Sequence, residues 1–125
     1  MPGPLGFLSV ALGGAIGSAL RYGVSLAAVR WLPGKSWPWA TFAVNAVGCL
    51  AIGWVLAGVR SQALSEPVRL FVAVGLLGGL TTFSTFGAET FSLLESGRWG
   101  LAVAYALCSV LAGLVAVWLG FTVHR

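Results

Sequence analysis

Four long stretches with almost no charged side chains alternate with short polar connections along this chain. They cover residues 4–29, 38–59, 68–94 and 99–122. Apart from Arg69 at the start of the third stretch, the only charged residues inside them are Arg21 and Glu89. Because a helix that crosses a bilayer needs about 20 apolar residues, the pattern predicts an all-α integral membrane protein with four transmembrane helices.

The connections between the stretches carry turn signals, and aromatic residues gather near them. The dipeptides that mark the three connections are Pro33-Gly34, Glu66-Pro67 and Ser96-Gly97. The tryptophans close to the ends of the stretches are Trp31, Trp37, Trp39, Trp54, Trp99 and Trp118. Tryptophan is typical of the belt where a membrane protein meets the lipid headgroups, so its placement supports the four predicted spans.

The composition excludes several classes of protein. Of the 125 residues, 58% are hydrophobic and 8% are charged, whereas an ordinary soluble domain has roughly 25% charged residues. We therefore expect one membrane domain over residues 1–125 with lipid as its surroundings. The basic residues are scattered at segment ends, which argues against nucleic acid as a partner. Without a P-loop or a Ser-His-Asp set, we expect no enzyme, and both cysteines are predicted to be small buried hydrophobes.

The segment Gly75–Phe86, GLLGGLTTFSTF, is the most unusual part of the third stretch. It contains three glycines and four hydroxyl residues within a membrane span. Irregular backbone at membrane depth is tolerated only where it faces protein or a water-filled path, so the segment favours a break in the third helix beside an ion site. The alternative is that small residues simply allow close helix packing.

Small residues also recur at the spacing i, i+4, which places them on one helix face. The pairs are Gly13/Gly17, Gly14/Ser18 and Gly75/Gly79. Such faces suit close contact between helices. Because four helices of this size enclose little space, we expect a homodimer to complete any pathway.

The basic residues flanking the spans leave the orientation undecided. One side of the membrane would have Arg60, Arg69 and Arg125, and the other would have Arg30, Lys35 and Arg98. The positive-inside rule then has no preferred direction. Two opposed copies would form an antiparallel dual-topology homodimer; the alternative is that another signal sets one orientation.

Two charged residues lie within the predicted spans. A guanidinium at the depth of Arg21 costs about 2.5–3.5 kcal/mol on insertion scales, so it faces protein or water, or snorkels to the interface. Glu89 should be paired or protonated, and Thr82, Thr85 and Glu89 share one helical face with the spacing of a polar track. Thr81 and Thr85 form an overlapping row of hydroxyls at the spacing i, i+4. The alternative for the threonines is a local bond to helix carbonyls.

Other polar and aromatic side chains repeat this spacing. Thr41 and Asn45 lie one turn apart in the second span, as do Tyr105 and Ser109 in the fourth. An intramembrane amide either joins helices or lines a path. Phe83 and Phe86 are a packing pair or, by the positive edges of their rings, a clamp for a small anion.

Three motifs together resemble those of the Fluc/CrcB fluoride channels. They are GGAIGSALRY (residues 13–22), TFAVNAVGC (residues 41–49) and GGLTTFSTFGAE (residues 78–89). The resemblance extends over the whole chain and implies a passive fluoride exporter of the bacterial inner membrane. It also implies an antiparallel dual-topology homodimer with two pores.

The resemblance implies roles for individual residues as well. A structural sodium ion would be bound at the dimer centre by the backbone carbonyls of Gly78 and Thr81. The residues implied to line the fluoride pore are Asn45, Phe83, Phe86, Thr82, Ser84, Glu89, Tyr105, Ser109 and Arg21, to which the spacing within the second span adds Thr41. Family members often have a further serine where this chain has Gly113, so the end of the track in the fourth helix departs from the family pattern.

Two other functions compete with a fluoride channel. A small dual-topology, proton-coupled multidrug exporter would need a buried glutamate in the first span, which instead contains Arg21. A non-transporting assembly subunit would not need Glu89, Asn45 and a row of hydroxyls together. A comparison of fluoride flux with chloride flux, in liposomes that contain only this protein, would separate these three functions.

Overall fold

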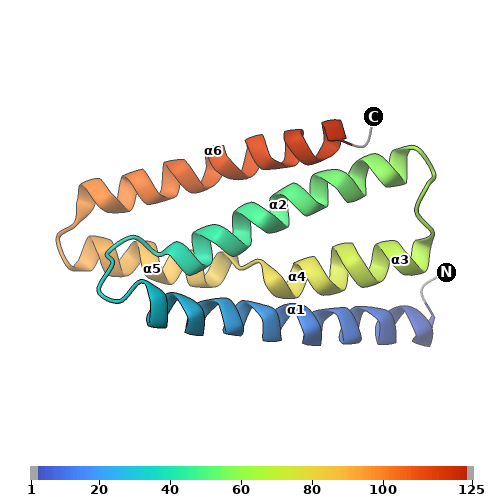
Figure 1. The fold of residues 1–125 in the computed structure, drawn as a ribbon, viewed down its shortest axis with the longest axis horizontal. Helices are drawn as coiled ribbons and strands as arrows, with labels where there is room; N and C mark the ends of the chain where they lie inside the picture. Colours follow the sequence, from blue (N-terminus) through green and yellow to red (C-terminus); the bar gives the residue numbers. More distant parts are fainter. Residues whose placement is uncertain (1–2, 124–125) are drawn as a thin grey trace.

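The structure, a computed structural model that describes residues 3–123, consists of long helices joined by short connections (Figure 1). Three spans are single helices: α1 (Pro4–Trp31), α2 (Trp39–Arg60) and α6 (Trp99–Val123). The other span is built in series from α3 (Glu66–Arg69), the π-helix η1 (Leu70–Leu76), α4 (Leu77–Leu80) and α5 (Phe83–Glu95). Four helical spans are long and apolar enough to cross a membrane, which confirms the predicted number and, within a few residues, their limits.

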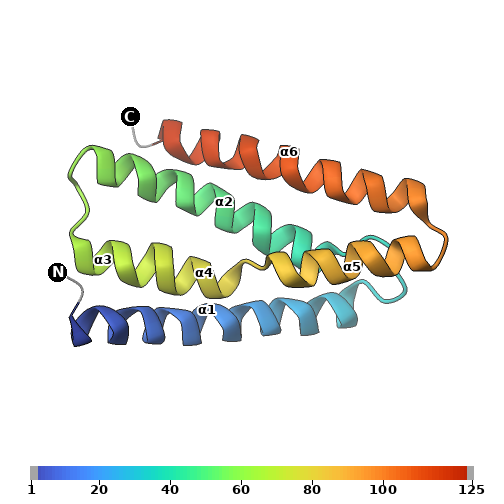
Figure 2. The ribbon, with the colours of Figure 1, turned by 180° about the vertical axis from the view of Figure 1, so that it is seen from behind.

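The spans lie side by side in a fixed order. Helix α1 runs along η1 and α4, and α2 runs along α6, while α5 contacts α6 (Figures 1 and 2). The α1–α2 connection and the α5–α6 turn lie at one end of the molecule, and the α2–α3 connection lies at the other. The interrupted span therefore lies between α1 and the α2–α6 pair, where it can contact both.

Glycines bring α1 against the interrupted span. A Cβ atom at Gly13 would overlap the carbonyl oxygen of Phe71, and one at Gly17 would overlap that of Leu76. From the other side, a Cβ at Gly79 would lie 2.6 Å from the carbonyl oxygen of Gly14. The prediction that these small-residue faces form helix contacts is confirmed, since only glycine permits this approach.

A second glycine seam joins α2 and α6, and the sequence analysis missed it. A Cβ at Gly53 would overlap the carbonyl oxygen of Val117, and one at Gly120 would overlap that of Leu50. These two glycines come from different helices and form no i, i+4 pair, so sequence spacing does not reveal them.

The connections follow the predicted turn chemistry with one correction. Gly34 and Gly97 adopt positive φ angles of 71° and 80°, as expected for glycine in turns. Glu66 and Pro67, predicted to lie in the second connection, instead form the first turn of α3. Proline favours this position because its missing N–H would be unpaired there in any case.

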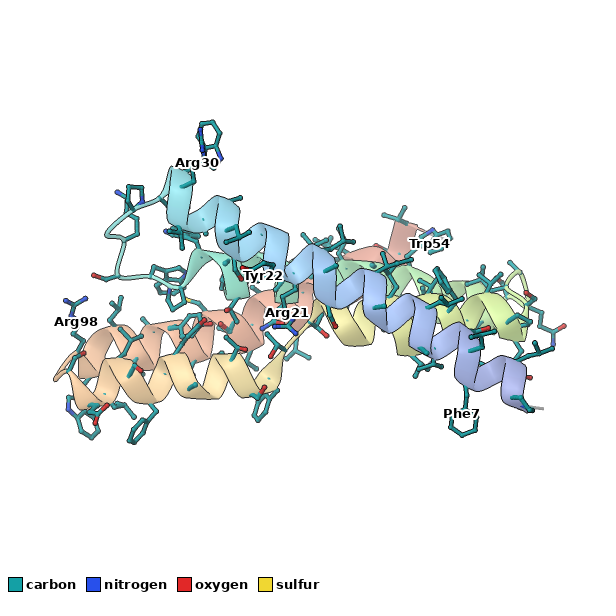
Figure 3. The ribbon with its side chains drawn as sticks, turned by 90° about the horizontal axis from the view of Figure 1, so that it is seen from below. Phe7, Arg21, Tyr22, Arg30, Trp54 and Arg98 are labelled. Carbon is teal, nitrogen blue, oxygen red and sulfur yellow. The ribbon has the colours of Figure 1, made fainter. Side chains whose placement is uncertain are left out.

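Large apolar side chains cover the outside of the molecule, and the largest fully buried side chain within residues 3–123 is that of Tyr105. Basic residues lie at the two ends. Arg60 ends α2 and Arg69 ends α3 at one end, while Arg30 and Arg98 lie apart from each other at the opposite end (Figure 3). Arg125, which the charge count included, is outside the described residues. An apolar exterior with charged ends is typical of a chain surrounded by lipid.

Candidate functional site

The backbone between α4 and α5 leaves the helical conformation for two residues. Thr81 has φ −82° and ψ 157°, and Thr82 has φ −152° and ψ 126°, both extended. The ribbon in Figure 1 shows this extended link near the middle of the span. Just before α4, the π-helix η1 adds a second departure from the regular α-helical ladder. Both irregularities lie at the level where a buried backbone needs protein partners.

Asn45 of α2 provides the partners for one extended residue. The side-chain Nδ2 of Asn45 donates to the carbonyl oxygen of Thr82 (3.1 Å), and the backbone N–H of Thr82 donates to Oδ1 of Asn45 (2.8 Å). In an uninterrupted α-helix, this N–H would donate to the carbonyl of Gly78 four residues earlier. The Asn45 side chain therefore accepts the Thr82 N–H that the Gly78 carbonyl would otherwise accept.

The side chain of Thr82 repeats this exchange at the start of α5. Its Oγ1 accepts from the backbone N–H of Thr85 (3.2 Å), as an N-cap does. That N–H would otherwise serve the carbonyl of Thr81. The Thr82 hydroxyl also donates to Oγ1 of Thr85 (3.1 Å).

The predicted threonine face is therefore only partly correct. Thr82 and Thr85 are joined by hydrogen bonds, but through a cap and not along a continuous helix. The Thr81 hydroxyl donates to the carbonyl oxygen of Leu77 (2.8 Å), as the alternative of a local bond to a helix carbonyl predicts. The Thr81/Thr85 row does not form because the backbone is extended between the two residues.

A cavity of about 380 Å³ lies beside the extended link. Its walls include the following predicted site residues: Asn45, Gly78, Thr81, Thr82, Phe83, Phe86 and Ser109. The Oγ atom of Ser109 is buried and has no hydrogen-bond partner within residues 3–123. A buried hydroxyl that lacks a partner is available to a small polar ligand.

The two phenylalanines of the cavity differ in their surroundings. Their ring centroids are 5.8 Å apart. Phe86 packs on Tyr105 with ring centroids 5.2 Å apart, whereas the Phe83 side chain is 83% exposed. One ring is thus held by the chain itself, and the other projects from it.

A carboxylate network joins α2, α5 and α6 next to this cavity. Thr41 Oγ1 donates to Oε1 of Glu89 (2.6 Å), and the Tyr105 hydroxyl donates to Oε2 (2.8 Å). Each carboxylate oxygen thereby receives a hydroxyl donor inside the bundle. The spacing predicted that Glu89 belongs with Thr82 and Thr85, but its hydrogen-bond partners come from other helices.

Two of the predicted pore residues belong neither to the cavity lining nor to the carboxylate network. Arg21 donates from Nε to the carbonyl oxygen of Gly79 (3.1 Å), so this guanidinium faces protein near the middle of α1 (Figure 3). Ser84 is exposed, and its Oγ lies 3.4 Å from Oγ1 of Thr82. Neither side chain lines the cavity of this single chain.

Sequence reasoning missed other residues of the cavity. Cys49 and Gly48 line it, and a Cβ at Gly48 would overlap the Thr81 methyl group. The signal was present, because Cys49 lies one turn after Asn45. The prediction that both cysteines are buried is wrong, because Cys49 is half-buried and Cys108 is exposed on an outward face of α6.

Known proteins are similar to this chain over almost its whole length. Residues 8–121 match the family model described as "CrcB-like protein, Camphor Resistance (CrcB)". A protein of Chloroflexus aurantiacus named "Fluoride-specific ion channel FluC" is 52% identical over 119 residues, with 94% of each chain covered. Proteins with the same name from Hyphomonas neptunium (50% identical, 96% of this chain and 95% of that one) and Thermus thermophilus (49% identical, 92% and 91%) are also similar.

Proposed function

This chain belongs to the CrcB-like family, and from that premise we propose that it is a fluoride-specific ion channel that lets fluoride leave the cytoplasm passively. Fluoride is the base of a weak acid, and the neutral acid crosses lipid and dissociates in a more alkaline cytoplasm. An inside-negative potential of about 2.3 kcal/mol per charge per 100 mV then drives the anion outward. A passive pore is sufficient to reduce the toxicity of the trapped ion.

One observation carries this proposal: the cavity beside the extended link combines hydrogen-bond donors with phenyl rings. The Asn45 amide has a second N–H beyond the one bound to Thr82, and the Ser109 hydroxyl has no partner within the part of the chain that the structure describes. Ring edges of Phe83 and Phe86 add weakly positive C–H groups. Donors and ring edges without a basic side chain in the lining suit a small anion that must also leave.

The proton-coupled exporter lacks its central residue in this chain. Helix α1 has no acidic side chain, and Arg21 occupies its middle. Glu89, in α5, is already engaged by two hydroxyl donors. A proton-exchanging carboxylate facing a drug-sized cation is therefore not what these helices provide.

The test is ion flux from liposomes that contain only this protein. Vesicles loaded with potassium fluoride should release fluoride only after valinomycin relieves the charge imbalance, and vesicles loaded with potassium chloride should not release chloride. No imposed pH gradient should be needed. Fluoride retention with valinomycin present, or release that depends on a proton gradient, would reject the channel.

The functional unit that we propose is an antiparallel, dual-topology homodimer in the inner membrane of a bacterium. The Phe83 ring supports it, because this side chain lines the cavity and yet is 83% exposed, so that a second subunit packed against it would complete the wall. Basic residues at both ends of the described chain support insertion in both directions. Reporters fused to the termini should show both orientations in cells, and a single orientation would contradict the proposal.

We also propose that the carbonyls of Gly78 and Thr81 bind a structural sodium ion at the dimer interface. In a continuous helix these carbonyls would accept from the backbone N–H groups of Thr82 and Thr85. Those N–H groups donate instead to the Asn45 side chain and to the Thr82 hydroxyl. The freed carbonyl oxygens suit a hard monovalent cation. When bound, the ion would supply a positive charge that holds two such links together.

Gly78 offers a direct test of the sodium site. A Cβ there would meet no other atom of the chain nearer than the Ala73 carbonyl oxygen at 4.0 Å. Gly78→Val should therefore leave the helices folded but weaken the dimer and abolish stabilisation by sodium. A variant that retains a sodium-stabilised dimer would contradict this assignment.

A further inference from the structure

We propose that a second cavity, at the end of the molecule that contains residues 32–38, holds one small anion at the mouth of the fluoride path. The indole N–H of Trp37 and the ammonium group of Lys35 would bind it. This inference rests on the proposed function and adds to it an entry site. Trp37 and Lys35 lie in the α1–α2 connection and do not line the cavity beside Thr81 and Thr82.

The second cavity has a volume of about 430 Å³ and lies between the end of α1, the connection to α2 and the first turn of α2. Its lining includes Lys35, Trp37, Thr41 and Glu89. The first two come from the connection and the other two from the carboxylate network. The space therefore extends from the surface of the bundle to the Glu89 group.

Trp37 has a donor that nothing in residues 3–123 accepts. Its Nε1 atom is buried and has no hydrogen-bond partner there. The ring is fixed by edge contacts with Tyr105 and Phe42, at centroid distances of 5.4 Å and 5.5 Å. Because an indole nitrogen only donates and most buried donors are paired, this N–H requires an acceptor that the chain itself does not supply.

The unpaired indole N–H and the ammonium group of Lys35 favour an anionic acceptor. Both oxygens of Glu89 already receive hydroxyl donors, from Thr41 and Tyr105. Lys35 is the basic residue of the lining, and Arg30 and Arg98 lie at the same end of the molecule (Figure 3). A cation would gain nothing from the indole N–H, whereas a small anion gains both the donor and the positive potential.

The mouth cavity also leads toward the first one. Glu89 lines the mouth cavity, and its partner Tyr105 packs on Phe86, which lines the cavity at the extended link. The carboxylate network lies between the two spaces. An anion held by Trp37 and Lys35 is thus located where it would wait before it passes this network.

The experiment records the indole N–H resonances of the ¹⁵N-labelled full-length protein in micelles while sodium fluoride replaces sodium gluconate. Trp37→Phe keeps an aromatic ring at this position, deletes the N–H and identifies its resonance among the six tryptophans. We expect this resonance to move downfield and saturate. Lys35→Gln should shift the half-saturating fluoride concentration upward by about tenfold. Trp118→Phe, on α6, is the control and should change neither result.

The outcomes separate this inference from the channel itself. In Asn45→Asp, which should not conduct, the Trp37 resonance should still respond to fluoride. A response without flux in the unmodified protein would retain the mouth site and reject the channel. A resonance that ignores fluoride in a conducting protein would overturn the mouth site, since water or a second subunit would then satisfy the donor.

Discussion

Two contact regions of this molecule are built by different means. Where α1 meets η1 and α4, the backbones touch through Gly13, Gly17 and Gly79, with one side-chain hydrogen bond, from Arg21. Where α2 and α6 meet the link and α5, side chains make the connections, through the Asn45–Thr82 pair and the Glu89 network. The first region is closely packed and has few polar side chains, while the second contains a cavity and several hydrogen-bond donors.

The difference shows how a small membrane protein can hold an irregular backbone in lipid. Dispersion contacts between closely packed backbones support one side of the interrupted span. Polar side chains on the other side replace the lost helical hydrogen bonds. We therefore expect substitutions at the glycine region to affect folding, and substitutions at the polar region to affect ion flux.

The largest effect is expected at Gly17. In Gly17→Ala the added methyl group would overlap the carbonyl oxygen of Leu76, so α1 must move away from η1 and α4. We expect the free energy of unfolding to fall by about 3 kcal/mol, the upper part of the usual range for overpacking. Thermal unfolding in detergent measures it. Gly23→Ala is the control, because a Cβ there has no neighbour within 4 Å; equal stability of the two variants would contradict the packing argument.

The second-largest effect is expected from Asn45→Asp, which should abolish fluoride flux and leave the fold unchanged. The carboxylate can still accept from the Thr82 N–H, but it loses both amide donors and repels an anion in the cavity. We expect fluoride efflux from liposomes to fall at least about a hundredfold, which corresponds to about 2.7 kcal/mol in the barrier. Thr90→Val is the control, since that hydroxyl only bonds back to the Phe86 carbonyl. Wild-type efflux in Asn45→Asp would remove the amide from the pathway.

Much of the fold could be predicted from the sequence, because charge-free runs and turn residues act locally. The four spans and the small-residue face of α1 follow from such patterns. The polar character of Asn45 and Glu89 at membrane depth also marked them as site residues. Which partners they have depends on the packing of different helices, and spacing along one helix does not contain that information.

The misjudged threonines illustrate this limit. A row at i, i+4 assumes a continuous helix, and Asn45 ends that continuity by taking the N–H of Thr82. Helical periodicity likewise cannot show the π-helix η1, or that Cys49 lines the cavity and Cys108 does not. Each of these features arises from contacts between segments far apart in the chain.

The two phenylalanines sharpen the comparison within the polar region itself. Phe83→Ile and Phe86→Ile each keep apolar bulk but remove the ring edge, and each should lower fluoride flux about tenfold or more if the rings contact the ion. Only Phe86→Ile should also reduce the stability of the chain, because Phe86 packs on Tyr105 whereas Phe83 is exposed. Phe91→Ile, another exposed ring of α5, is the control. Normal conduction in both variants would assign the rings to packing alone.

The smallest effect is expected from Tyr105→Phe, which removes one hydroxyl from the Glu89 network. The ring can remain in its fully buried position, and Glu89 retains the donor from Thr41. Hydrogen bonds between membrane helices are worth about 0.6 kcal/mol on average and about 1.7 kcal/mol at most, so the loss of unfolding free energy should stay within that range. Fluoride flux should fall by less than about tenfold, because the cavity walls and Asn45 are unchanged.

Tyr22→Phe provides the matched control for this variant, since Tyr22 is 65% exposed on α1. Comparing the two in the same liposome and unfolding assays isolates the hydroxyl that Glu89 accepts. If Tyr105→Phe behaves like Tyr22→Phe in both assays, the Tyr105–Glu89 bond contributes neither to stability nor to conduction. If it instead loses more stability than Gly17→Ala, the polar region and not the glycine region holds the fold, and the proposed division between the two regions is wrong.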